Sequence, residues 1–363
     1  VWVQCLGSLV RGSFLDKHRI TNCPLFLAFC RILCYHCSEV IFLQFLGHTL
    51  SSPLFLAPMA GVTDYAFRTV CAELGAGVTV TEMVSSRALV YQDKKSIRLL
   101  RKNPASLCGV QIFGNDPAIM AEAAALALAH SGCDFIDINM GCPMPKIANN
   151  GDGSALMRDI PLAGRIVRAV KDAVSVPVTA KIRLGWDKSS ICAVEMAQAL
   201  QDNGVDAVAV HGRTKSMLYS GAADWDAIGK VVRAVSVPVI ANGDLVSAQA
   251  LERCRAHTGA SLFMVGRATF GDPWIFSEFS ALLAGRPIPE RPPLAERIET
   301  ALHQFDLAIE DKGDHIACLE ARKHLAWYLR GVAHSGYYKE QISRLSAPEE
   351  VRAVAKAIQR DLR

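Results

Sequence analysis

A single thiol, Cys142, is the residue of the sequence best placed to do chemistry. It follows a run of apolar, β-favouring residues that starts at Asp134, and the flanking Gly141 and Pro143 end that run. The sequence therefore predicts a buried strand with a thiol at its C-terminal end, which is where an α/β barrel carries its reactive groups. A lone cysteine is more often an inert packed residue, so Cys142 gains its meaning from the groups that accompany it.

Short segments at the ends of the other predicted strands occupy the same place, and nearly all of them carry glycines or side chains able to hydrogen-bond. They are Pro58, Met59 and Ala60 after the first strand, Glu82 after the second, Gln111 within the third, Asn139 at the end of the fourth, Lys181 and Arg183 on the fifth, His211 and Arg213 after the sixth, Asn242, Gly243 and Asp244 after the seventh, and Gly266 and Arg267 after the eighth. The carboxyl ends of parallel strands meet at one face of a barrel, so these groups predict one shared ligand in the barrel mouth.

Two kinds of group in this set indicate the chemistry of that ligand. Gly243 and Gly266 let backbone N–H groups approach an anion closely, and Arg267 adds a guanidinium that can donate two hydrogen bonds to the anion. Gln111 offers an amide to the edge of a heteroaromatic ring, and Lys181 places a positive charge beside an electron-rich ring. A phosphate site opposite an amide and a cation suits flavin mononucleotide (FMN). We expect no metal site.

The elements that must position these groups alternate regularly from Leu54 onward, in the pattern of parallel strands joined by crossover helices. Asp64 and Asp116-Pro117 are helix start signals. Eight strands predict a (β/α)8 TIM barrel, which we place at residues 45–285. Strands are expected at 54–57, 78–81, 107–113, 134–139, 177–183, 207–210, 238–241 and 261–265, and helices near 65–74, 116–131, 160–174, 190–203, 224–235 and 247–257.

The composition limits the class of protein. Of 363 residues, 51% are hydrophobic and 20% are charged, which is ordinary for a globular protein and argues against disorder. The net charge of +4 permits an anionic partner without requiring one. The twelve cysteines form no disulfide pattern. We therefore expect a reduced, cytoplasmic protein with no membrane segment and no stable protein partner.

Residues 1–44 differ from the rest of the chain. The spacing of Cys30, Cys34 and Cys37 is similar to the iron–sulfur cluster loop of radical-SAM enzymes, and Cys34, His36 and Cys37 also fit part of a zinc site. Five cysteines within residues 1–50 produce such spacings by chance, and no further residues complete either site. We expect residues 1–44 to be a poorly ordered or loosely packed extension outside the enzyme.

Short motifs surround the strand ends. They read APMAGVTD at 57–64, TEMV at 81–84, VQIFG at 110–114, DINMGCP at 137–143, GSALM at 153–157, KIRLGW at 181–186, HGRT at 211–214, IANGD at 240–244, GRATFGDPWIF at 266–276 and ARKHLAWYL at 321–329. Together they resemble the tRNA-dihydrouridine synthases, and most closely the bacterial B-type branch. The resemblance runs from about Phe45 to the C-terminus, and residues 1–44 have no counterpart in it.

The resemblance implies an enzyme that reduces specific uridines in tRNA to 5,6-dihydrouridine, with FMN that NADPH or NADH reduces. No Gly-x-Gly-x-x-Gly motif opens a helix after a strand, so we expect the nicotinamide to bind only transiently. Reduction of the uracil double bond needs a hydride at one carbon and a proton at the other, and a thiol can supply the proton.

The resemblance also implies a role for individual residues. Cys142 is the implied proton donor, and Asn139, Lys146 and Arg183 are the implied substrate contacts. The implied FMN contacts are Pro58, Met59, Ala60, Gln111, Lys181, His211, Asn242, Gly243, Asp244, Gly266 and Arg267.

The C-terminal part of the chain predicts a separate helical domain. Residues 286–293 form a proline-rich linker, and residues 294–363 are helical in pattern. An apolar stripe from Cys318 to Val332 predicts one buried face. Other faces of this helical stretch are expected to contact tRNA through Arg322, Lys323 and Arg330. Trp327 either contacts the bases or packs against a neighbouring helix.

Three alternatives remain open from the sequence. The first is an FMN-dependent dehydrogenase of a small pyrimidine such as dihydroorotate, in which the helical domain would have no purpose. The second is a class I aldolase with Lys181 as the Schiff-base residue. The third is a non-catalytic RNA-binding protein that retains the barrel.

Overall fold

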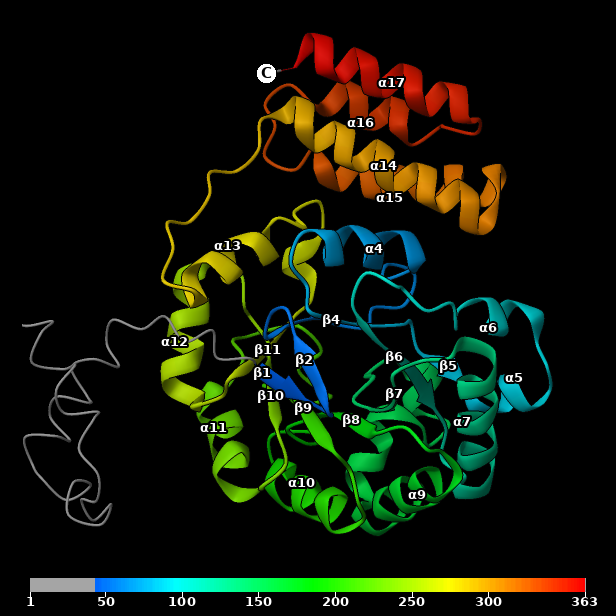
Figure 1. Ribbon diagram of the computed structural model, residues 1–363, viewed down its shortest axis with the longest axis vertical. Helices are drawn as coiled ribbons and strands as arrows, with labels where there is room; N and C mark the ends of the chain where they lie inside the picture. The colour runs from blue at the N-terminus through cyan, green and yellow to red at the C-terminus, as the bar shows by residue number, and fades with distance from the viewer. Residues whose placement is uncertain (1–42, 363) are drawn as a thin grey trace, which may run out of the picture. The chain divides into compact units, whose positions relative to one another are not determined.

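The computed structural model describes residues 43–362, and eight parallel strands in it form a closed barrel (Figure 1). They are β3 (Leu54–Leu56), β4 (Val78–Val80), β6 (Leu107–Phe113), β7 (Phe135–Met140), β8 (Val178–Arg183), β9 (Ala207–His211), β10 (Val239–Asn242) and β11 (Leu262–Val265). Strands adjacent in this series are hydrogen-bonded, β11 pairs with β3, and the pairing of β4 with β6 completes the ring. The expected (β/α)8 barrel is confirmed.

An outer layer of helices connects the strands. The crossover helices are α4 (Tyr65–Glu73), α7 (Pro117–Ser131), α9 (Ile160–Ala173), α10 (Ala193–Asp202), α11 (Trp225–Ala234) and α12 (Ala248–Thr258), and α13 (Ile275–Leu283) follows the last strand. Both predicted start signals act as caps, since Asp64 accepts a hydrogen bond from Phe67 N at 2.8 Å and Asp116 accepts one from Ala118 N at 2.9 Å.

Several short elements were not expected from the sequence. The β4–β6 connection contains β5 (Val84–Ser85), α5 (Ser86–Val90) and α6 (Lys94–Arg98). The β7–β8 connection contains α8 (Pro145–Ala148) and a 3₁₀ helix, η1 (Gly153–Arg158), and a second one, η2 (Arg267–Thr269), follows β11. Helices of one turn are too short to show the apolar periodicity from which helices are predicted.

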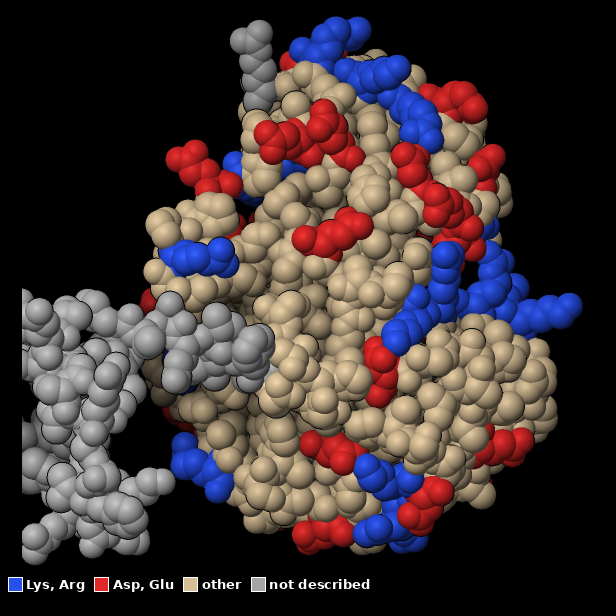
Figure 2. Space-filling model, in the orientation of Figure 1, with Lys and Arg blue, Asp and Glu red and all other residues tan. Residues whose placement is uncertain are grey.

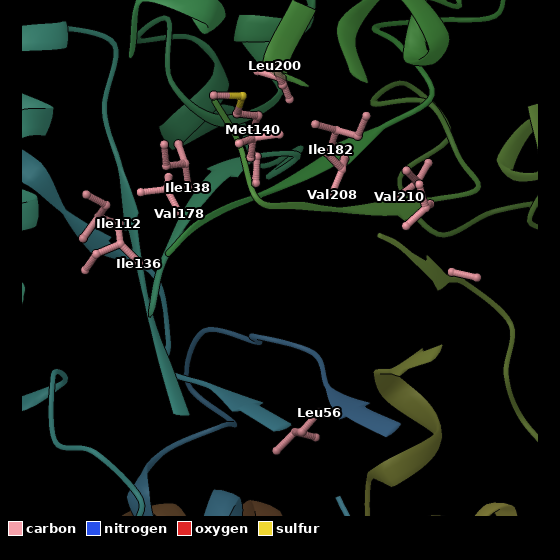
Figure 3. Packing of buried hydrophobic residues seen from close by; sticks show 14 of the residues in the cluster. Leu56, Ile112, Ile136, Ile138, Met140, Val178, Ile182, Leu200, Val208 and Val210 are labelled. Atoms are coloured by element: carbon pink, nitrogen blue, oxygen red, sulfur yellow. The ribbon is translucent and has the colours of Figure 1, made fainter. Parts of the chain in front are cut away.

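The strands bury side chains on both faces because helices cover the outside of the barrel. Outward-facing side chains pack against the helices, as Figure 3 shows for Ile112 of β6, Ile138 of β7 and Ile182 of β8. Inward-facing side chains such as Phe55, Phe135 and Met264 fill the interior. The alternation has a period of two, so it also decides which strand-end residues point into the barrel mouth.

A two-stranded hairpin, β1 (Leu43–Phe45) and β2 (His48–Leu50), contributes to the interior core of the barrel. The ring of Phe45 meets those of Phe55 and Phe135 edge-on, with centroids 5.1 and 6.3 Å apart. The hairpin begins at Leu43, two residues before the expected start of the barrel. The cysteine spacings of the N-terminal extension lie outside the described residues, as does residue 363.

Four helices follow the proline-rich segment 286–293, which has no helix or strand. They are α14 (Leu294–Lys312), α15 (Asp314–Tyr328), α16 (Gly336–Ile342) and α17 (Pro348–Asp361). The predicted apolar stripe of α15 is buried among them, and Ala66 and Trp274 from the barrel belong to the same cluster. Residues 43–363 therefore form one compact unit. Within the described residues no helix has the length and apolarity to cross a bilayer.

Contacts between α15 and the barrel are close. Trp327 stacks on Phe270, with ring centroids 4.3 Å apart and planes 11° from parallel. Gly271 has a φ of +70°, and an added Cβ there would lie 2.1 Å from the carbonyl oxygen of Trp327. Only glycine allows the two backbones to approach this closely.

Candidate active site

A cavity of about 910 Å³ lies at the carboxyl ends of the barrel strands. Its size lies within the range of about 300–1,000 Å³ that is usual for small-molecule sites. Its walls come from the ends of most of the barrel strands and from Arg330, which follows α15. The predicted site residues that line it are Pro58, Met59, Ala60, Asn139, Cys142, Lys181, Arg183, His211, Asn242, Gly243, Asp244, Gly266, Arg267 and Arg330.

Cys142 sits on the loop between β7 and α8, and backbone hydrogen bonds fix the loop. Asn139 Oδ1 accepts hydrogen bonds from Cys142 N at 2.9 Å and from Gly141 N at 3.2 Å, and Ser154 N donates to the Cys142 carbonyl at 3.1 Å. The side chain is partly buried. Burial raises the pKa of the Cys142 thiol, so the thiol carries its proton at neutral pH.

A chain of hydrogen bonds supports Asn139 from below the cavity. Asn139 Nδ2 donates to Gln111 Oε1 at 2.8 Å, and Gln111 Nε2 donates to Asp137 Oδ2 at 2.6 Å. Thr179 Oγ1 donates to the other oxygen of Asp137 at 2.6 Å. Burial raises the pKa of Asp137, and these two donors oppose that rise. The chain fixes the orientation of the Asn139 amide and, through it, the position of Cys142.

Two cations on β8 face the cavity. Burial lowers the pKa of Lys181 to about 8, and the neighbouring charge of Arg183 adds to this effect. Within residues 43–362 Lys181 Nζ makes no hydrogen bond and no ion pair, although the charge of Asp137 lies close enough to oppose the fall in its pKa. The Arg183 guanidinium is engaged instead, since it donates to the carbonyls of Gly141, Thr214 and Leu218 at 2.8–2.9 Å. Lys181 is thus available to a ligand, whereas Arg183 ties the Cys142 loop to the loop after β9.

His211 and Asp244 are held by a buried arginine. Arg213 Nη2 donates to Asp244 Oδ2 at 2.7 Å, and Arg213 Nη1 lies 3.4 Å from His211 Nε2. Burial lowers the pKa of His211, and the positive charge of Lys181 adds to this effect, so the ring is neutral at neutral pH. A neutral imidazole offers a ligand one donor and one acceptor.

Glycines and a second arginine form the opposite wall. Gly243 has a φ of +123°, and an added Cβ there would lie 2.8 Å from the Ala223 Cβ. At Gly266 an added Cβ would meet only Ala57 and Met59, both at 3.7 Å. The side chain of Arg267 is half exposed, 3.8 Å from Asp244 Oδ1 and over the ring of Tyr219 at 4.5 Å. This wall presents backbone and a guanidinium to the cavity, which are groups that bind anions.

Comparison with known proteins decides the family. The model of the dihydrouridine synthase (Dus) family matches residues 55–363. The chain belongs to the dihydrouridine synthase family. It is therefore an oxidoreductase, as the sequence predicted.

Individual relatives agree with this assignment. The tRNA-dihydrouridine synthase B of Pseudomonas putida is 43% identical over 84% of this chain and 90% of its own length. The protein of the same name from Pasteurella multocida is 38% identical over 84% and 92%. A probable tRNA-dihydrouridine synthase of Rickettsia conorii is 37% identical over 84% and 92%. The expected resemblance to the B-type branch is confirmed.

Solved structures support the fold alone. The 6-hydroxypseudooxynicotine amine oxidase of Pseudomonas geniculata matches with a TM-score of 0.54 and 17% identity, over 72% of this chain and 52% of that larger one. The histamine dehydrogenase of a Rhizobium species matches with a TM-score of 0.53 and 15% identity, over 73% and 51%.

Four residues that the sequence assigned to FMN or substrate do not line the cavity of this dihydrouridine synthase family member. Gln111 is only 1% exposed and lies beneath Asn139. Lys146 is exposed on α8. Arg322 Nε donates to the Leu345 carbonyl at 2.7 Å, and Lys323 Nζ donates to the Gly61 carbonyl. Their assigned contacts stay predictions.

Sequence reasoning missed other residues of the site. Asp137 precedes Asn139 by two positions on β7, so the period of two places both side chains inside the barrel, and that pattern was available as a signal. Arg213 stood at a strand end without an assigned role. Tyr219, half exposed in the cavity wall, lies over both Arg183 and Arg267. It belongs to a loop with no local signal.

Proposed function

We propose that the protein reduces uridines in tRNA to 5,6-dihydrouridine, using FMN that is bound in the cavity and is reduced by NADPH or NADH. The observation that carries this proposal is the position of Cys142. Its protonated thiol lines the same cavity as Lys181, His211 and the glycine–arginine wall. A proton donor that faces a cofactor site is the arrangement that the reduction of a carbon–carbon double bond needs.

The donor set of the cavity fits FMN. Gly266 leaves space that a side chain would fill, and Gly243 and Arg267 supply an anion site for the phosphate. Lys181, which makes no hydrogen bond among the described residues, would place a positive charge beside the electron-rich part of the flavin ring. Neutral His211 and Asn242 would offer hydrogen bonds to the same ring. Bound FMN, once reduced, supplies the hydride.

The residues of the chain supply the proton and the geometry. Cys142 donates its thiol proton to the carbon of uracil that does not receive the hydride. Asn139 holds the Cys142 backbone in place, and the carbonyl of Gly141 accepts from Arg183 on the other side. Because the thiol pKa is raised, the proton is present before the substrate arrives.

Two of the alternatives are set aside, because a family of oxidoreductases accommodates neither an aldolase nor a non-catalytic RNA-binding protein. The small-pyrimidine dehydrogenase is separated by the substrate itself. We expect turnover with unmodified tRNA and none with dihydroorotate. Turnover of dihydroorotate alone would contradict the proposal.

The central test is Cys142→Ala. The variant should keep its flavin absorbance, because Cys142 is not among the groups that we assign to FMN. It should lose about 100-fold or more of its rate of tRNA reduction, because a general acid contributes about 10²–10⁴-fold. Dihydrouridine formed in an unmodified tRNA transcript, with NADPH as the electron source, measures the rate.

Cys192→Ala is the matched control. Its thiol is also partly exposed, but it donates to the Met157 carbonyl at 3.2 Å and does not line the cavity. This variant should retain wild-type turnover. Equal rates for Cys142→Ala and wild type would remove Cys142 from the mechanism, and a wild-type protein that takes up no flavin would overturn the assignment of the cofactor.

A further inference from the structure

The connection between β4 and β6 carries an unusual concentration of positive charge. Residues 86–102 contain six Lys or Arg and a single acidic residue, Asp93, whereas the whole chain has 39 basic and 35 acidic residues. The basic residues are Arg87, Lys94, Lys95, Arg98, Arg101 and Lys102, which we call the α5–α6 patch. Figure 2 shows Lys and Arg side chains gathered where α6 lies in Figure 1.

Most of these charges have no neutralising partner in the part of the chain that the structure describes. Arg101 pairs with Asp311 at 2.7 Å and Lys102 with Asp134 at 2.6 Å. Within residues 43–362 no carboxylate lies within ion-pair distance of Arg87, Lys94, Lys95 or Arg98, all of which are exposed. The carboxylate of Asp93 is occupied as the N-cap of α6, where it accepts from Ser96 N and Ser96 Oγ at 2.8 Å.

The patch reaches from the catalytic loop to the C-terminal helices. Burial raises the pKa of Asp152, and the charge of Arg87 opposes that rise, so Arg87 lies near Asp152. The next residue, Gly153, packs against Cys142, since an added Cβ there would lie 3.1 Å from the Cys142 Cβ. At the other end Arg98 Nη2 donates to the Asp311 carbonyl at 3.3 Å, next to the end of α14.

An exposed aromatic ring accompanies the charges. Tyr91, between α5 and α6, is 80% exposed. A contact with single-stranded RNA commonly has two parts. Cations bind the phosphate backbone, and an aromatic ring stacks on an unpaired base. The C-terminal helices have no comparable excess of positive charge, because residues 294–363 hold eleven basic and eleven acidic residues. Arg322 and Lys323 are also engaged with backbone carbonyls.

We propose that the α5–α6 patch is the main docking surface for the sugar–phosphate backbone of the RNA substrate, with Lys94 and Lys95 on phosphates and Tyr91 against a base. The proposal rests on the proposed function, because that function supplies the RNA. It places the principal electrostatic contact on the barrel, in a connection of the chain distinct from the helical domain.

The test is Lys94→Gln/Lys95→Gln. Each lost phosphate contact lowers the slope of log Kd against log salt by about 0.7–0.9, so the slope for an unmodified, fluorescently labelled tRNA transcript should fall by about 1.4–1.8. We expect the Kd at physiological salt to rise about tenfold. The FMN content should be unchanged, because neither lysine lines the cavity.

Two further variants provide controls. Lys230→Gln/Arg253→Gln removes the same net charge from exposed positions on α11 and α12, across the barrel, and should bind tRNA as the wild type does. Lys94→Arg/Lys95→Arg keeps the charge and should also retain wild-type affinity. If both glutamine variants bind tRNA more weakly to the same extent, the loss of affinity comes from net charge alone. That result would overturn the proposal that the α5–α6 patch docks the RNA.

Other outcomes separate the patch from the reaction. Wild-type Kd and salt slope in Lys94→Gln/Lys95→Gln would overturn the patch even if the enzyme makes dihydrouridine. Binding to phosphatidylglycerol vesicles that is lost in this variant, while tRNA binding persists, would assign the patch to a membrane instead. If the wild type binds tRNA through the patch but forms no dihydrouridine, the proposed function fails and the docking surface stands.

Discussion

At the scale of residues, burial in the cavity shifts the pKa values of two groups, the Cys142 thiol and the Lys181 amine. Cys142 is partly buried, and burial keeps its thiol protonated. Lys181 is also desolvated, which brings its pKa down to about 8. Burial favours the neutral form of both groups, yet at neutral pH it leaves the Cys142 thiol protonated and the Lys181 amine still mostly charged.

The pKa of Lys181 predicts a pH dependence of flavin binding. The amine is charged below about pH 8 and neutral above it. If FMN binds the charged form, the apparent Kd of the apoprotein for FMN should rise about tenfold between about pH 7 and about pH 9. Quenching of FMN fluorescence on binding measures the Kd.

Lys181→Met provides the comparison for this pH dependence. It lacks the titrating group, so it should bind FMN more weakly than the wild type at about pH 7 and show a flat profile over the same range. Parallel pH profiles for the two proteins would show that Lys181 does not contribute its charge to the flavin.

At the scale of elements, α15 supports the barrel mouth through one aromatic stack. Phe270 lines the cavity, and Trp327 of α15 covers its other face. Lys323, one turn earlier on α15, holds the carbonyl of Gly61, whose N–H donates to Glu82 Oε2 at 2.6 Å. The loop that carries Pro58, Met59 and Ala60 is therefore held by the barrel and by α15.

Loss of this stack should destabilise the protein. Removal of a fully buried tryptophan side chain costs about 3–5 kcal/mol. Trp327 is only half-buried, so Trp327→Ala should cost about 2–3 kcal/mol of unfolding free energy. Urea unfolding of the FMN-bound protein, followed by circular dichroism, measures the change.

Tyr337→Ala is the control for the stack. This side chain is 65% exposed on α16, so its removal should change the unfolding free energy by less than about 0.5 kcal/mol. Equal destabilisation by the two variants would mean that α15 does not hold the barrel mouth through Trp327.

At the scale of the whole molecule, every residue to which the proposed reaction gives a role lies within residues 43–362. The described residues form the barrel interior, the layer under its helices and the core of the helical domain. The family match, which covers residues 55–363, lies within the same part of the chain.

This distribution predicts the effect of a truncation. A protein of residues 43–363 should fold. Its Kd for FMN and its rate of tRNA reduction should stay within about twofold of the values for the full chain. This corresponds to a change of less than about 0.5 kcal/mol in the free energy of binding or of activation. Equilibrium binding and single-turnover assays on both proteins test this. A truncated protein without flavin would show that residues 1–42 take part in the site.

The sequence by itself determined the barrel and most of the residues in its mouth. The reason is local, since strand residues alternate with a period of two, glycine and proline mark the strand ends, and parallel strands bring those ends to one face. Cys142, Lys181, Asn242 and Arg267 were predictable in this way and line one cavity.

Only the tertiary structure decided which polar groups remain available to a ligand. Lys323 is engaged by Gly61, 262 residues away in sequence, and Gln111 lies under Asn139 instead of in the cavity wall. The short helix α6, which carries Lys94 and Lys95, is too short to show a periodic signal. A side chain selects its partner by proximity in the folded chain, and that proximity is not encoded in the local pattern of residues.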